Sequence, residues 1–228
     1  MLYSVVFGER MSGFVKTWGD GLPVGILQGH SCDDSGLGGV GVVDIQAKKM
    51  IHYSRIANKE GRMLKGQDIV VLAALMGDGG DGESYLELGR RVCLSASETH
   101  AAVRRLQASS LLTSDRRLLR HNAEEFLVHG LRYAFPFRPS GGVVRGLATS
   151  YAAPVAKDVF ATTGFVPVWN CTSGETLGLP FDPLYETAPE AARKDRPLYD
   201  RLAVFDMLRG GRLRERQFAE AKLREMMS

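Results

Sequence analysis

The sequence predicts a mainly α fold with a small β part, of the α+β class. Two S-x-x-E patterns, at 84–87 and 95–98, support the helical part. In such a capping box the serine and the glutamate satisfy free backbone N–H groups at the start of a helix. The β part is predicted by two short apolar runs, 165–169 and 176–181, which flank a polar, glycine-containing loop.

Residues 1–62 are predicted to be a poorly structured N-terminal extension, because glycine is dense in them. The cluster at 36–41 has the composition of a phosphate-binding loop, but no helical pattern follows it, so we favour irregular chain. The stretch 59–61 is Lys-Glu-Gly, whose codons are purine-rich, as in a ribosome-binding site. We therefore hypothesise an over-long gene prediction with translation starting at Met63, which an intact peptide from residues 1–62 would refute.

Three helices are predicted between residues 64 and 112. The first is amphipathic and covers 64–76, and the glycine- and aspartate-rich run 77–82 ends it. The two capping boxes then predict a short helix over 85–91, a Cys93-Leu94 turn and a longer helix to about residue 108. The longer helix is expected to bury its apolar residues and to expose six others: Ser95, Ser97, His100, Ala101, Arg104 and Arg105.

The stretch 84–112, SYLELGRRVCLSASETHAAVRRLQASSLL, resembles the helix-turn-helix of winged-helix regulators, in particular the MarR-like group. It shares with that family a helix, a Leu-Ser turn, a second helix with a paired basic step, and an apolar exit. It departs from the family at Cys93, where a turn glycine is usual, and at Ser110, where many relatives have glycine before the final apolar pair. The resemblance implies a winged helix-turn-helix DNA-binding domain over 63–139, whose second helix enters the major groove.

The resemblance also implies two short strands and a wing after the second helix. The segment 113–120 is short and basic, so we expect a reduced wing, with a solvated basic turn as an equally weighted alternative. Base and phosphate contacts are assigned to polar and basic side chains of the second helix and the wing. These predicted DNA-binding residues are Ser95, Ser97, His100, Arg104, Arg105, Arg116, Arg117 and Arg120.

A helix over 123–133, capped by Asn122, is predicted to follow the wing. The remaining region, 140–228, is predicted to hold a hairpin and helices over 197–208 and 212–227, which would serve dimerisation or partner binding. Two aromatic side chains of the hairpin are expected in the core: Phe165 and Trp169.

Composition sets few limits on function. The chain has 228 residues, of which 44% are hydrophobic and 24% charged, as in an ordinary globular protein. A net charge of +3 excludes nothing, because DNA binding requires only a local basic face. The three cysteines are widely spaced without a C-x-x-C pair, so we expect free thiols, no metal and no cofactor. Without a signal pattern or a membrane-length apolar run, we expect a cytoplasmic protein.

These patterns favour a binding protein over an enzyme. No hydrolase, metalloprotease or nucleotide-binding motif occurs, so we expect no enzymatic activity. The leading hypothesis is a sequence-specific, double-stranded DNA-binding transcriptional regulator, a homodimer that inserts the helix 95–108 into the major groove. The alternative is a protein–protein adaptor or antitoxin-like autoregulator, whose region 140–228 captures a partner protein.

Overall fold

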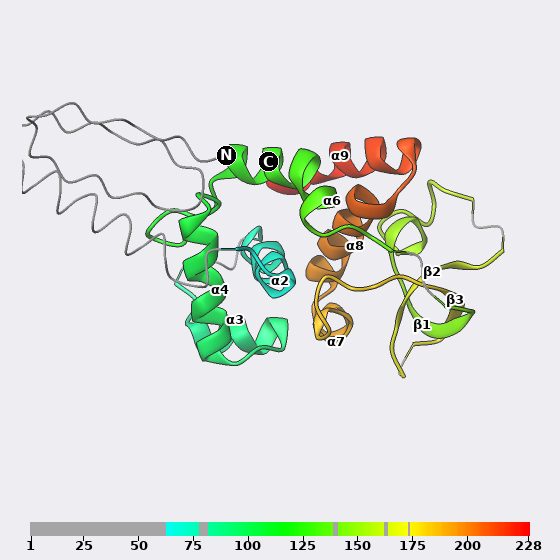
Figure 1. Ribbon diagram of the computed structural model, residues 1–228, viewed down its shortest axis with the longest axis horizontal. Helices are drawn as coiled ribbons and strands as arrows, with labels where there is room; N and C mark the ends of the chain where they lie inside the picture. The colour runs from blue at the N-terminus through cyan, green and yellow to red at the C-terminus, as the bar shows by residue number, and fades with distance from the viewer. Residues whose placement is uncertain (1–62, 78–81, 139–140, 162–163, 173) are drawn as a thin grey trace, which may run out of the picture. The chain divides into compact units, whose positions relative to one another are not determined.

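A computed structural model describes most of the chain beyond residue 62 (Figure 1). The described residues are 63–77, 82–138, 141–161, 164–172 and 174–228. They all belong to one compact unit. The predictions made for residues 1–62 lie outside the described residues. Within these ranges, no helix combines the length and apolar character needed to cross a membrane.

The three helices predicted before residue 112 are present. They are α2 (Gly66–Leu75), α3 (Tyr85–Val92) and α4 (Ala96–Ala108). The prediction of an amphipathic first helix was wrong, because α2 is buried on every side from Asp68 to Leu75. A helix that is apolar all round requires packing partners on all its faces.

The next helical segment begins earlier than predicted and is not regular. It consists of α5 (Arg120–Glu125), a π-helical turn η1 (Phe126–Gly130) and α6 (Leu131–Ala134). Asn122 is not its cap: the side-chain amide donates a hydrogen bond to the carbonyl oxygen of Ser110, at 2.8 Å. The segment is thereby attached to the end of the preceding helical region.

A small closed sheet forms the β part. Its strands are β1 (Val144–Ala148), β2 (Val166–Asn170) and β3 (Thr176–Pro180). Two strands lie where the sequence predicts them, but the predicted hairpin was wrong, because β2 and β3 pair in parallel. Both run antiparallel to β1, which pairs with each of them in turn.

Two glycines allow this tight closure. Gly146 pairs with both β2 and β3, and a Cβ atom there would lie 2.1 Å from the carbonyl oxygen of Trp169. Gly174 passes so close to Gly146 that its own Cβ would lie 2.0 Å from that residue's carbonyl carbon. Any side chain at either position would therefore force the strands apart.

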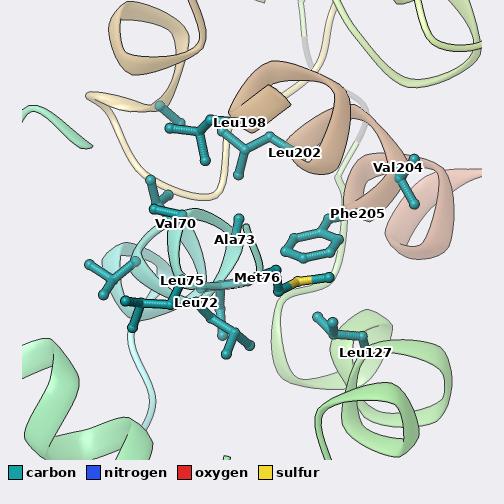
Figure 2. Close-up of a cluster of buried hydrophobic side chains, with 14 of the residues drawn as sticks. Val70, Leu72, Ala73, Leu75, Met76, Leu127, Leu198, Leu202, Val204 and Phe205 are labelled. Carbon is teal, nitrogen blue, oxygen red and sulfur yellow. The ribbon is translucent and has the colours of Figure 1, made fainter. Parts of the chain in front are cut away.

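Three helices complete the chain: α7 (Ala188–Lys194), α8 (Arg196–Gly210) and α9 (Leu213–Met227). In Figure 2, Leu202 and Phe205 of α8 lie beside Ala73 of α2 and beside Met76, the residue that follows α2. All four belong to a single hydrophobic cluster of buried residues. The boundary predicted at residues 139 and 140 therefore does not separate two hydrophobic cores.

A buried polar cluster joins the sheet to α8. The Asp206 carboxylate accepts hydrogen bonds from the Thr149 hydroxyl and the Trp169 indole N–H, both at 2.7 Å. The Arg209 guanidinium lies 3.2 Å from the other carboxylate oxygen. Burial raises the pKa of Asp206 to about 6, although Arg209 and the two hydrogen-bond donors act in the opposite direction. Trp169 is buried, as predicted.

Candidate nucleic-acid interface

Both predicted capping boxes are formed. At the start of α4, the Glu98 N–H donates to the Ser95 hydroxyl at 3.2 Å, and the Ser95 N–H donates to the Glu98 carboxylate at 3.0 Å. The corresponding distances between Ser84 and Glu87 at α3 are 3.2 and 2.9 Å. Hydrogen bonds from the serines lower the pKa of both glutamates. Ionised carboxylates at these positions suit the positive ends of the helices.

The turn between α3 and α4 has a left-handed residue at Cys93, the position where the sequence resemblance to the MarR-like group predicts a glycine. Cys93 has a φ of +56°, and the N–H of Leu94 donates to the carbonyl oxygen of Gly89 at 2.8 Å. Ser110, the second departure from the family pattern, also has a φ of +56°. The backbone thus adopts at both positions the conformation that glycine favours, without a glycine.

One face of α4 is held firmly by the rest of the molecule. Thr99, Ala102, Val103 and Leu106 are fully buried in the core formed with α2 and α3. Arg105 lies on the same side and makes a two-pronged ion pair with Asp68 of α2, with both N–O distances at 2.7 Å. Asp68 is fully buried and also accepts the N–H of Lys65 at 2.8 Å.

The expectation that Arg105 faces outward was therefore wrong. Arg105 is only 8% exposed, and its hydrogen bonds to Asp68 raise the pKa of its guanidinium. A guanidinium that is buried and paired in this way cannot also reach a phosphate. Arg105 therefore anchors α4 to α2 and does not form part of the exposed surface of α4.

The opposite face of α4 carries three exposed side chains in a row. Ser97, His100 and Arg104 follow one another at intervals of three and four residues, so they share one side of the helix. Among the described residues, Arg104 has no hydrogen-bond or ion-pair partner. Ser95 is also exposed, but its hydroxyl serves the helix cap.

Tyr85, at the first position of α3, links this face to the following segment. Its ring meets the His100 ring edge-on with 4.9 Å between centroids, and the Arg116 guanidinium lies 4.9 Å from its centre. Arg116 also donates to the carbonyl oxygen of Glu83 at 2.8 Å. Arg116 is therefore folded back onto the start of α3, against the same Tyr85 ring that His100 contacts.

A very small hairpin occupies the place of the predicted wing. Leu112 and Leu118 form a single antiparallel bridge, and the N–H of Thr113 donates to the carbonyl oxygen of Arg117 at 2.8 Å. The Gln107 amide of α4 donates to two carbonyl oxygens of this hairpin, both at 3.0 Å. The hairpin is thus fastened to α4, but one bridge is less than the two strands and wing that the resemblance implies.

The two other arginines predicted for the wing, Arg117 and Arg120, lie in different parts of the structure. Arg117 is exposed near the tip of the hairpin. Arg120 is the first residue of α5, and its guanidinium donates to the carbonyl oxygens of Met227 and Ser228 at the end of α9. Arg120 therefore supports the contact between α5 and α9 and lies outside the group that the exposed α4 face brings together.

Sequence reasoning missed three residues that organise this surface: Asp68, Tyr85 and Gln107. Each acts through a contact with another helix or with the hairpin, so local periodicity gave no indication of it. Asp68 did carry one usable signal, because an acidic residue in the middle of an apolar helix requires a buried partner.

The described part of the chain contains no group of three or more His, Cys, Asp or Glu side chains that could hold a metal ion. Two cysteines lie in this part, Cys93 and Cys171, and both are free and partly buried. No family model, no curated protein and no solved structure matches the chain. The MarR-like resemblance therefore remains a prediction, and the functional argument depends on the geometry.

Proposed function

We propose that the protein is a sequence-specific, double-stranded DNA-binding transcriptional regulator that inserts α4 into the major groove. The observation that carries the proposal is the division of α4 into two faces. One face is fixed in the core by apolar packing and the Asp68–Arg105 pair. The other presents Ser97, His100 and Arg104 to solvent. A rigid helix with exposed polar and arginine side chains has the form that groove recognition requires.

The roles of the three residues differ. Arg104 would donate two hydrogen bonds to a guanine, which is the commonest specific contact of this kind. Ser97 and His100 lie closer to the start of α4, the end that reads base edges in helix-turn-helix complexes. Arg117 would contact phosphate beside them. Arg105 is excluded from this set because it is buried against Asp68, and Arg120 because its guanidinium lies at the end of α9.

The same face is poorly suited to an apolar protein contact. The exposed large hydrophobic side chains in the described ranges do not include any residue of α4. Protein interfaces generally have an apolar centre, and no exposed large hydrophobic side chain of α4 supplies one. We therefore propose that α4 binds DNA and not a partner protein.

We further propose that the protein acts in the cytoplasm as a homodimer. The two-fold symmetry of such a dimer would match a palindromic operator. Two copies of α4 would then enter major grooves about 34 Å apart. This spacing predicts an operator with two half-sites separated by about one turn of B-DNA.

The proposal is tested by selecting sites from randomised DNA duplexes with the full chain. The selected duplex is then titrated against the wild type, Arg104→Ala and the control Arg145→Ala, which removes an exposed arginine of β1. We expect Arg104→Ala to lose about 1–3 kcal/mol of discrimination at one base pair, and Arg145→Ala to bind normally. Failure to enrich any sequence, or equal preference by wild type and Arg104→Ala, would refute the groove assignment.

A further inference from the structure

The surface around the small sheet is unusually apolar. Of the nine exposed large hydrophobic residues in the described ranges, six lie on this lobe or at the start of α9. They are Val143, Val159, Phe165, Leu177, Leu179 and Leu213. Phe165 was expected in the core, but 56% of it is exposed. Exposed apolar side chains that gather in one region mark interaction surfaces more often than isolated ones do.

Three of these residues line a cleft of about 1050 Å³ between the sheet and the first turn of α9: Phe165, Leu179 and Leu213. Paired aromatic rings strengthen its walls. Phe137 and Phe181 stack with 4.0 Å between centroids and 5° between planes, and Tyr151 meets Phe160 at 6.4 Å. Because these rings hold one another in place, the cleft exists before any ligand arrives.

The rim of the cleft is positive. Arg212 and Arg214 are exposed at the start of α9 and line the cleft together with Glu215. The Glu215 carboxylate accepts the backbone N–H of Arg212 at 2.8 Å, so part of its hydrogen-bonding capacity serves the helix cap. An apolar centre is thus bordered by groups that attract carboxylates.

We propose that this cleft binds an acidic peptide segment of a partner protein, through one large apolar or aromatic anchor residue flanked by aspartate or glutamate. The anchor fills the space beside Phe165 and Leu213, and the carboxylates face Arg212 and Arg214. Val143, Val159 and Leu177 are also exposed on this lobe but do not line the cleft.

Two other occupants fit these observations less well. In a symmetric dimer each copy would bring the same positive rim to the contact, and like charges would then be opposed. Nucleic acid-binding surfaces are polar and strongly basic, whereas most of the exposed apolar residues here are aliphatic. The inference does not depend on α4, and it holds whether or not α4 binds DNA.

The test is a selection of random twelve-residue peptides, displayed on phage, against the immobilised full chain. We expect the enriched peptides to share a large apolar or aromatic residue with carboxylates on either side. A fluorescent copy of one of them should bind Phe165→Asp and Leu213→Asp at least about tenfold more weakly than the wild type. Both side chains are more than half exposed, so we expect unchanged thermal melting.

Charge reversal provides the matched control. Arg212→Glu with Arg214→Glu should reject the acidic peptide and accept its lysine-substituted counterpart, while selection of DNA by α4 stays unchanged. The proposal is overturned if no common peptide emerges, if the enriched peptides lack carboxylates, or if they bind the Phe165→Asp variant equally well. Sedimentation that shows a wild-type dimer dissociated by Phe165→Asp would assign the cleft to a second copy and also overturn it.

Discussion

Replacement of Arg105 by alanine separates the two roles that an arginine on α4 can have. In the structure Arg105 is paired with the fully buried Asp68 of α2 through two N–O contacts of 2.7 Å. Arg105→Ala would leave that carboxylate buried without its charge partner. We therefore expect the variant to be defective in folding stability, whereas Arg104→Ala should be defective only in DNA binding.

The magnitude follows from the burial of the pair. Loss of one partner from a buried ion pair costs about 3–5 kcal/mol, because the remaining charge is left uncompensated. The Lys65 N–H still donates to Asp68 in the variant, which favours the lower part of this range. For a unit of this size, each kcal/mol lowers the melting temperature by about 2–4 °C. We expect a decrease of roughly 6–15 °C.

Urea unfolding of the full chain, followed by circular dichroism, measures the effect. Arg104→Ala is the matched control, and its exposed side chain predicts a change within about 0.5 kcal/mol. In the double variant Asp68→Leu with Arg105→Leu, no buried charge remains, so most of the lost stability should return. A stability loss below about 1 kcal/mol for Arg105→Ala, together with lost DNA binding, would show that Arg105 contacts DNA and that our reasoning is wrong.

Three further predictions concern other contacts. Cys93→Gly should raise the free energy of unfolding by about 0.5–1 kcal/mol, because Cys93 has a φ of +56°; an unchanged urea midpoint would contradict this. The raised pKa of Asp206, about 6, means that its ionisation costs stability as pH increases, so the stability of the wild type relative to Asp206→Asn should fall by about 3 kcal/mol between about pH 4 and pH 7. A pH-independent difference between the two proteins would refute the assignment. Gln107→Ala removes the two hydrogen bonds that hold the hairpin, so amide exchange around Thr113 and Arg117 should accelerate while the α4 core stays protected.

The sequence was most informative where the structural cause is local. The two capping boxes involve residues three positions apart, and the helices that they predicted begin where expected. The strands at 166–170 and 176–180 were likewise indicated by short apolar runs with a polar break between them. In each case the signal and the structure it determines occupy the same few residues.

The errors arose where the deciding partner is distant in sequence. Arg105 was assigned to the exposed face, but its partner Asp68 lies 37 residues away. The pairing of β2 with β3 was taken for a hairpin, because the antiparallel partner of both strands, β1, lies earlier in the chain. Phe165 has a large apolar side chain, as core residues usually do, and yet it borders an open cleft. Periodicity specifies which residues share a face but not what covers that face.

The buried contact between α2 and α8 determines how the two halves of the chain depend on each other. Leu198, Leu202 and Phe205 of α8 belong to the same apolar cluster as the buried residues of α2. Because α2 also holds α4 through Asp68, the helix that we propose reads DNA is supported by residues more than ninety positions later. The region 140–228 is therefore part of the scaffold of the proposed DNA-binding surface. The apolar cleft at the sheet is the feature of this region that its scaffold role does not explain, which is why we assign a partner to it.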